Sequence, residues 1–220
     1  MYKRQVKAYG LPEEYPPEVM EQVSRIPDEV TAEEMQGRKD IRSWQTVTID
    51  GEDAKDLDDA ITISREAYGY RLGVHIADVS HYVTENSPLD QEALRRGTSV
   101  YLVDRVIPML PHKLSNGICS LNEGTDRLAL SCIMDLDFQG RVLGHEVAET
   151  VIQVDRRMTY TAVNAIVTDQ DPNTMEEYRD FTEMFALMKE LADILRERRY
   201  QRGSIDFDFP ETKMILDEKG

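Results

Sequence analysis

Ten consecutive residues, 50–59, carry six acidic side chains and one lysine, and strand-forming apolar residues flank them on both sides. Like charges at this density repel one another unless a cation offsets them, and buried flanking strands leave the carboxylates little room to spread into solvent. Magnesium and manganese bind carboxylate oxygens, and paired ions can hold the attacking and leaving oxygens in phosphodiester cleavage. This acidic segment, residues 50–59, therefore predicts either a divalent-cation site for phosphoryl chemistry or a solvated acidic turn.

Other metal sites fit the residues less well. An EF-hand loop needs Asp or Asn at its third and fifth positions and Gly at its sixth, where this segment has Glu52, Ala54 and Lys55. A zinc site needs Cys or His, and the segment has neither. Cys119 and Cys132 are too few for a disulfide framework and are expected to act as buried small hydrophobic residues in a reducing compartment.

The composition limits the class of protein. The chain has 26 Lys and Arg against 42 Asp and Glu, a formal net charge of −16, which disfavours a basic nucleic-acid-binding surface over the whole chain. No apolar run approaches the roughly 18 residues of a membrane span, and residues 1–10 lack the apolar stretch of a secretory signal. We therefore expect a soluble cytoplasmic protein with no membrane partner.

The elements that must position the acidic segment are mostly strands. β-Branched residues on either side of it predict strands at residues 46–49 and 60–63, and alternating residues predict a hairpin over 59–77 with its turn at 67–70. A second hairpin is expected from residues 128–138 and 142–152 around Gln139-Gly140. Because hairpins outnumber strand–helix–strand units, the expected fold is α+β, a mixed, mainly antiparallel sheet with flanking helices.

Helix signals are found between and after these strands. A helix after the prolines at 16–17 should place Val19, Met20 and Val23 on one side. A capping-box pattern predicts a short helix at 31–37, and Ser87, Pro88 and Gly97 bracket a helix at 88–96. An apolar stripe at three- and four-residue intervals predicts one helix of about seven turns at 175–200.

Residues 48–61, which contain the acidic segment, resemble the first signature of the ribonuclease II / ribonuclease R family of exoribonucleases, in the bacterial ribonuclease R variant. Further blocks of the same catalytic domain follow in family order at residues 73–83, 96–111, 114–121 and 157–161. The resemblance covers roughly residues 40–220. It implies that these are the N-terminal part of a truncated RNB-type catalytic domain, and that residues 1–39 are a lead-in segment that follows a cold-shock region.

The resemblance also implies an activity and a site. Family members are processive 3′→5′ exoribonucleases that use magnesium to release nucleoside 5′-monophosphates. On this sequence, the family's four aspartates fall on Asp50, Asp56, Asp58 and Asp59 as the metal site for Mg²⁺, with Mn²⁺ as an alternative. Asp50 and Asp59 are the implied direct ligands, Asp56 supports the metal shell, and Asp58 is the most critical to hydrolysis, so Asp56 and Asp58 are the catalytic pair.

Two aromatic residues are implied to bind RNA. Tyr101 falls where the family has an aromatic side chain that stacks on terminal bases and sets the length of the last product. Phe207, at the end of residues 203–207, resembles the second aromatic of that clamp in a less distinctive block. Packing in the protein core is the alternative for each ring.

The expected partner is RNA with a single-stranded 3′ end, bound by a monomer. In the family, the catalytic domain continues through an arginine-bearing block and an S1 RNA-binding domain, so these 220 residues are expected to be incomplete for activity alone. The alternative is a catalytically inactive acidic module of the same fold that binds cations or a basic protein. The intact set of four aspartates favours the enzyme.

Overall fold

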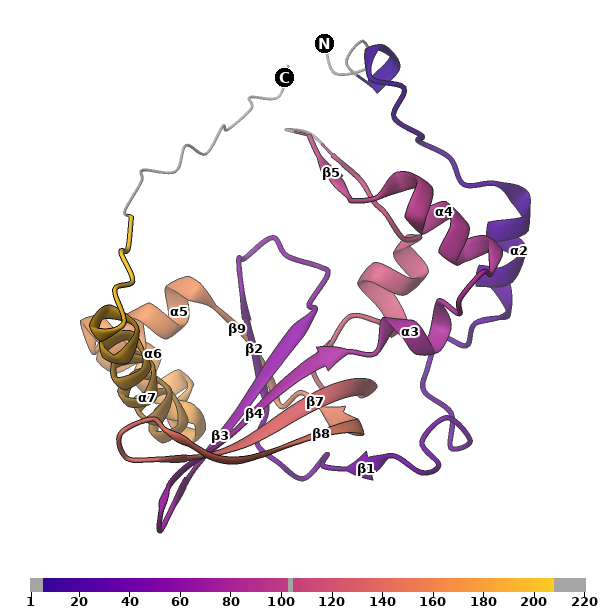
Figure 1. The fold of residues 1–220 in the computed structure, drawn as a ribbon. Coiled ribbons are helices and arrows are strands. Elements are labelled where there is room, and N and C mark those ends of the chain that lie inside the picture. The colour runs from indigo at the N-terminus through magenta and orange to yellow at the C-terminus, as the bar shows by residue number, and fades with distance from the viewer. Residues whose placement is uncertain (1–5, 103–104, 208–220) are drawn as a thin grey trace.

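A computed structural model describes residues 6–102 and 105–207 of the chain. Within these residues, seven strands form one sheet in the order β1-β8-β7-β4-β3-β2-β9 (Figure 1). Their bounds are Lys39–Asp40 (β1), Val47–Asp50 (β2), Asp59–Glu66 (β3), Gly69–Ala77 (β4), Asp126–Asp137 (β7), Val142–Gln153 (β8) and Arg156–Thr159 (β9). The pairs β1/β8 and β2/β9 are parallel and the other four are antiparallel. The predicted mainly antiparallel α+β fold is confirmed.

Both predicted hairpins form. β3 pairs with β4 along its full length, and the turn between them is only two residues, 67–68, rather than 67–70. Gly69 closes this turn with φ +146°, and a Cβ atom there would stand 2.1 Å from the Leu136 carbonyl oxygen on β7. The second hairpin joins β7 to β8 through Gly140, which has φ +71°. A separate two-stranded ribbon pairs β5, Val100–Tyr101, with β6, Val106–Ile107.

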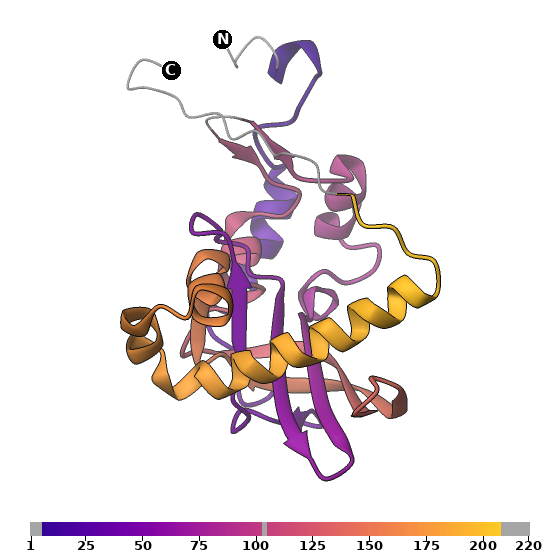
Figure 2. The same ribbon diagram turned by 90° about the vertical axis from the view of Figure 1, so that its left-hand side faces the viewer.

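The helices lie in two groups, one on each side of the sheet in Figure 1. One group holds α2, α3, α4 and a wide helical turn, with bounds Pro17–Arg25, Val79–Tyr82, Pro88–Arg96 and Lys113–Ile118. The other holds α5, α6 and α7, with bounds Tyr160–Asn164, Pro172–Glu177 and Thr182–Gln201, and α7 runs obliquely across the strands (Figure 2). None of the described helices combines the length and the apolar character needed to cross a bilayer.

Local signals set the ends of α2 and α4. The Ser87 hydroxyl accepts a hydrogen bond from the Asp90 backbone N–H at 3.2 Å, and Gly97 ends α4 with φ +73°, as predicted. α2 begins at Pro17 and buries Val19 and Val23, but the prediction that Met20 shares their side is wrong, because Met20 is exposed.

The predicted helix at residues 31–37 is absent; these residues form turns. The reciprocal capping contacts do form, since the Thr31 backbone N–H donates to Glu34 at 2.7 Å and the Glu34 N–H donates to the Thr31 hydroxyl at 3.3 Å. Gly37 then takes φ +80° and ends the segment. Too few residues remain to offset the cost of nucleating a helix.

The predicted single helix at 175–200 is also wrong, because it breaks at Tyr178. Tyr178 has φ −109° and ψ 30°, outside the helical range, and a 3₁₀ turn, Arg179–Phe181, separates α6 from α7. Tyr178 and Phe181 nevertheless pack on the same buried cluster as Phe185 of α7. The apolar spacing therefore runs across the break unchanged, which is why the pattern did not reveal it.

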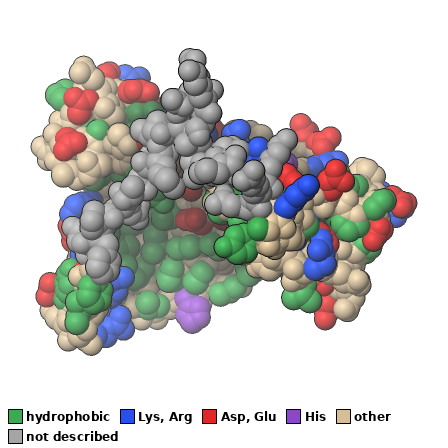
Figure 3. Space-filling view, turned by 90° about the horizontal axis from the view of Figure 1, so that it is seen from above, with side chains coloured by type: hydrophobic (Ala, Val, Ile, Leu, Met, Phe, Trp, Pro, Cys, Tyr) green, Lys and Arg blue, Asp and Glu red, His purple; other side chains and the backbone are tan. Residues whose placement is uncertain are grey.

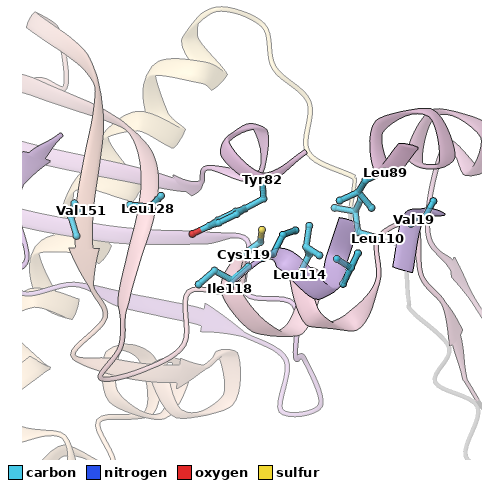
Figure 4. Close-up of a cluster of buried hydrophobic side chains, with 11 residues drawn as sticks. Val19, Tyr82, Leu89, Leu110, Leu114, Ile118, Cys119, Leu128 and Val151 are labelled. Carbon is cyan, nitrogen blue, oxygen red and sulfur yellow. The ribbon is translucent and has the colours of Figure 1, made fainter. Parts of the chain in front are cut away.

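Three buried clusters fix the sheet. One lies between the sheet and α5–α7 and includes Phe185. The second lies among α2, α4 and the turn at Lys113–Ile118 and reaches Val151 of β8 (Figure 4). It contains Cys119, whose thiol is free and whose burial raises its pKa to about 12, whereas Cys132 is only half-buried. The third cluster contains Leu57 of the acidic segment.

A buried polar row crosses five strands or their ends. His75 on β4 has Nδ1 2.7 Å from the Ser131 hydroxyl and Nε2 3.0 Å from the Thr62 hydroxyl. The row continues from Thr62 to the Thr46 hydroxyl at 2.8 Å and from Ser131 to the Thr150 hydroxyl at 2.6 Å. Both ring nitrogens are thus satisfied inside the protein, and His75 is a structural residue of the sheet.

The burial of His75 predicts a pH-dependent stability. Burial lowers its pKa from 6.5 to about 4, so the unfolded chain binds a proton between these values that the folded chain does not. The free energy of unfolding should therefore fall as pH drops from 6.5 to 4, by up to about 3 kcal/mol. Urea unfolding of His75→Gln should show a shallower pH slope than the native chain, and His145→Gln, on the exposed part of β8, should not. Equal slopes for all three proteins would contradict the assignment.

Candidate active site

The acidic segment connects β2 to β3, since Asp50 ends β2 and Asp59 begins β3. In Figure 1 it forms a loop above the ends of these strands. Its anchor is Leu57, whose side chain is buried in the third cluster. The Leu57 N–H donates to the Ser120 hydroxyl at 3.0 Å, and the Leu57 carbonyl accepts from the Leu121 N–H at 2.9 Å. One residue is thus fixed by its side chain and by both backbone groups.

The carboxylates lie on either side of this anchor. Asp56 is half-buried, and Asp58 and Asp59 are exposed. The Asp58 carbonyl accepts a hydrogen bond from the Ala77 N–H of β4 at 2.9 Å, which continues the β3–β4 pairing toward the anchor. Leu57 is buried while Asp58 and Asp59 are exposed, so the anchor faces the protein interior and the acidic residues that follow it face outward.

Arg157 of β9 holds the other half of the segment. Its Nη2 donates to the carbonyl oxygens of Gly51, Glu52 and Ala54 at 3.4, 3.0 and 2.7 Å. Its Nε is buried and has no partner among the described residues. The pKa of the Asp50 carboxyl group is raised overall, by burial and by the charge of Asp59, and the guanidinium charge of Arg157 opposes this rise.

Two of the four aspartates have raised pKa values. For Asp50, burial is the largest cause and the charge of Asp59 the next, with Asp58 and Asp56 contributing after the opposing Arg157. Asp58 is exposed by fractional area, but the protein around its carboxyl group still desolvates it, and this raises its pKa more than the charges of Asp56 and Asp59 do. The four carboxylates are therefore near enough to repel one another.

The donor set suits a hydrated divalent cation better than a closed protein cage. Asp50 has a buried Oδ2 without a hydrogen-bond partner among the described residues, an oxygen left for a cation to bind. Within residues 6–102 and 105–207, however, no three or more Asp, Glu, His or Cys side chains come close enough to enclose an ion. Magnesium keeps several waters and needs only one or two carboxylates, so the residues fit it.

Tyr101 of β5 is brought to the acidic segment from 45 residues away in the chain. Its hydroxyl donates to Asp56 Oδ2 at 3.0 Å, and this hydrogen bond is the largest cause of the raised pKa of Tyr101. The side chain is 66% exposed, so the core-packing alternative for Tyr101 is wrong. Its ring is available beside the carboxylates.

Phe207 is not brought to the same place. It lies on the extended segment after α7 and is 73% exposed, so it is not a core residue either. Figures 1 and 2 show this segment standing apart from β5. Its implied role in RNA binding stays a prediction.

Two residues absent from the sequence-based site prove to hold it. Ser120 supports Leu57, and it also donates to the Lys55 carbonyl at 2.9 Å. Arg157 holds the carbonyls of the segment. Both lie inside recognised blocks, 114–121 and 157–161, but they act on backbone atoms, and residue type alone does not signal such a contact.

Comparisons with known proteins agree with this fold. The family model described as "RNB domain" matches residues 38–220. Ribonuclease R of Thermotoga maritima is 54% identical over 216 residues, which cover 96% of this chain and 30% of the relative. Ribonuclease R 1 of Lactococcus lactis is 52% identical over 208 residues, which cover 94% of this chain and 25% of the relative.

A solved structure gives the same result. The structure of Mycoplasma genitalium RNase R in complex with double-stranded RNA superposes with a TM-score of 0.84 at 31% identity, covering 97% of this chain and 38% of that one. The chain thus spans about a quarter to a third of the length of these curated relatives. On the match over residues 38–220 and these identities, the chain belongs to the RNB domain family.

Proposed function

We propose that these residues form the metal-binding part of a 3′→5′ exoribonuclease that hydrolyses RNA from a single-stranded 3′ end, processively, to nucleoside 5′-monophosphates. The observation that carries the proposal is the unpartnered, buried Oδ2 of Asp50 among three further carboxylates. Membership of the RNB domain family and the names of the relatives, Ribonuclease R, support the same activity. Because the relatives are three to four times longer, the activity belongs to the complete protein.

Each aspartate has a proposed part. Asp50 and Asp59 would bind Mg²⁺ directly, or Mn²⁺ in its place, and Asp56 and Asp58 would complete the site. When bound, the ion would supply positive charge to the attacking and leaving oxygens of the phosphodiester. Asp58 is assigned the largest effect on hydrolysis.

The chain's own contacts position these groups. Tyr101 holds Asp56 through its hydroxyl and leaves its ring face free to stack on a terminal base of any sequence. Arg157 fixes the backbone of residues 51–54 and so holds the first half of the acidic segment in place. Tyr101 and Arg157 therefore both act by holding parts of the acidic segment in position.

One observation favours the alternative, a catalytically inactive acidic module that binds a cation or a basic protein. No three acidic side chains of the described residues come close enough to enclose an ion, and a surface that binds a basic protein needs no such convergence. The two functions differ in whether loss of one aspartate stops RNA degradation.

Asp58→Asn provides that test in a chimera, in which these 220 residues replace the matching segment of Thermotoga maritima Ribonuclease R. Degradation of 3′-tailed RNA with magnesium should fall by roughly 100-fold or more, since metal charge stabilisation is worth several kcal/mol, while RNA binding persists. Asp53→Asn removes one charge from the same segment and should retain activity. Equal rates for the two variants would favour the inactive module.

Replacement of Tyr101 tests the stacking role in the same chimera. Tyr101→Ala should lengthen the smallest RNA product on a gel, because the ring that holds the last bases is lost. Tyr101→Phe keeps the ring and removes only the hydrogen bond to Asp56, so its products should keep their native length. If Tyr101→Ala leaves the product ladder unchanged, Tyr101 does not stack on RNA.

Arg157→Met should loosen the acidic segment of the 220-residue chain. Hydrogen bonds from a charged group contribute about 1.5–3 kcal/mol, so amide hydrogen exchange in residues 51–56 should speed up by roughly tenfold or more. Arg156→Met is the control: Arg156 is the neighbouring residue on β9 and pairs with Glu123 instead. Hydrogen-exchange mass spectrometry measures both variants. Unchanged exchange in Arg157→Met would show that the hydrogen bonds of Arg157 do not hold the acidic segment in place.

A further inference from the structure

The ribbon that carries Tyr101 is too short to be stable on its own. β5 and β6 pair over only two residues each, and an isolated two-stranded ribbon is marginally stable in water. Tyr101 is 66% exposed and Val106 is 39% exposed, so these two side chains add little packing. In Figure 1 the ribbon rises from the group of α2 and α4, and Figure 3 shows hydrophobic side chains flooring a hollow between the two helix groups. The position of the Tyr101 ring therefore depends on how the base of the ribbon is held.

A buried arginine joins the two strands at this base. Arg96 ends α4 just before β5, and its side chain is only 2% exposed. Its Nη1 donates to the carbonyl oxygen of Pro108, the residue that follows β6, at 3.0 Å. The Met109 N–H donates to the Ser99 hydroxyl at 3.0 Å and links the same two stretches of chain. Arg96 Nε donates to Glu92 at 2.8 Å, so the buried guanidinium charge is paired.

Residues that precede α2 reach the same point. Arg96 donates through Nη1 to the Pro12 carbonyl at 3.0 Å and through Nη2 to the Glu14 carbonyl at 2.7 Å. The centre of the Tyr15 ring lies 3.8 Å from Arg96 Cζ, and the Tyr15 hydroxyl donates to the Pro108 carbonyl at 2.7 Å. The N-terminal part of the chain thus binds the base of the ribbon directly, through Tyr15, and also through Arg96.

The helix α4 does not itself need this arginine. Gly97 already ends α4 in the left-handed conformation, and Glu92 is already bound by Arg95 at 2.6 and 2.7 Å. The Nη atoms of Arg96 instead bind backbone carbonyls on two segments that are distant in the chain. Arg157 holds the acidic segment in the same way, and the rigid fork of N–H donors suits arginine to such a junction.

We propose that Arg96 and Tyr15 are positioning residues for Tyr101, which fix the base of the ribbon and through it the length of the last RNA product. With the base fixed, the Tyr101 ring stays beside Asp56. The family model matches from residue 38 onward, so Tyr15 contributes to this positioning from outside the matched domain. The proposal rests on the stacking role proposed above for Tyr101.

Hydrogen exchange tests whether Arg96 holds the ribbon. In the chimera with Thermotoga maritima Ribonuclease R, Arg96→Met removes the hydrogen bonds to the Pro108, Pro12 and Glu14 carbonyls. Amide exchange in β5 and β6 should then speed up by roughly tenfold or more, because hydrogen bonds from a charged group are lost. Arg95→Met is the control: Arg95 neighbours Arg96 and binds Glu92, and its loss should leave the exchange in the ribbon unchanged.

A milder variant tests the same contact from the N-terminal side. Tyr15→Phe keeps the ring over Arg96 and removes only the hydrogen bond to the Pro108 carbonyl. It should speed exchange in β5 and β6 by about two- to tenfold. Tyr9→Phe is its control, because Tyr9 is 80% exposed, and it should change nothing.

Product length separates positioning from a loss of stability. Arg96→Met should shift the smallest RNA product toward the longer product of Tyr101→Ala, whereas a loss of stability alone would lower the amount of product and leave its length unchanged. The double variant Arg96→Met, Tyr101→Ala should give the ladder of Tyr101→Ala alone, because Arg96 acts through the ring. If Arg96→Met does not fold, Tyr15→Phe takes its place in both assays and should shift the ladder in the same direction.

The outcomes distinguish this proposal from the stacking role. If Tyr101→Ala lengthens the product and Arg96→Met changes neither the ladder nor the exchange, only the positioning role is overturned. Faster exchange with an unchanged ladder, or a double variant whose product is longer than that of Tyr101→Ala, overturns it as well. An unchanged ladder in Tyr101→Ala itself overturns the stacking role and the positioning role together.

Discussion

Mutual repulsion among the carboxylates is the constraint that the rest of the site must satisfy. Two like charges at 4 Å repel by about 1 kcal/mol in water and about 4 kcal/mol near a protein surface. The chain opposes this through atoms that carry no negative charge: burial of Leu57 contributes about 1.5–3 kcal/mol, and the hydrogen bonds of Arg157 contribute a similar amount. The stabilisation by Leu57 and Arg157 is similar in size to the repulsion between carboxylates that stay apart. Carboxylates held closer together would repel more strongly than these two residues offset. The aspartates accordingly do not enclose an ion among the described residues.

The sheet places this anchored segment where two different surfaces meet. Ala60, the neighbour of Asp59 on β3, belongs to the same buried cluster as Leu57. Asp59 itself points to the opposite side, beside Ile76 of β4. The loop is therefore anchored on one side of the sheet and presents the Asp59 carboxylate on the other.

Much of this arrangement could be predicted from the sequence, because its signals are local. Alternation located both hairpins, Ser87 and Gly97 located α4, and the resemblance selected the aspartates and Tyr101. The misses have another origin. Tyr178 breaks a helix without interrupting the apolar spacing, and Arg157 and Ser120 act on backbone atoms far away in the chain, so only tertiary structure reveals them.

The hydrogen bonds from Arg157 to the backbone of the acidic segment affect which changes this loop can accept. Arg157 binds carbonyl oxygens, which every amino acid has, so the side chains of residues 51–54 can be replaced without loss of these hydrogen bonds. Length is different. Inserting or deleting one residue between Ala54 and β3 would move the Leu57 backbone away from Ser120 and Leu121, which bind it. Within the loop, the side chains of residues 51–54 can therefore be replaced more easily than the number of residues can change.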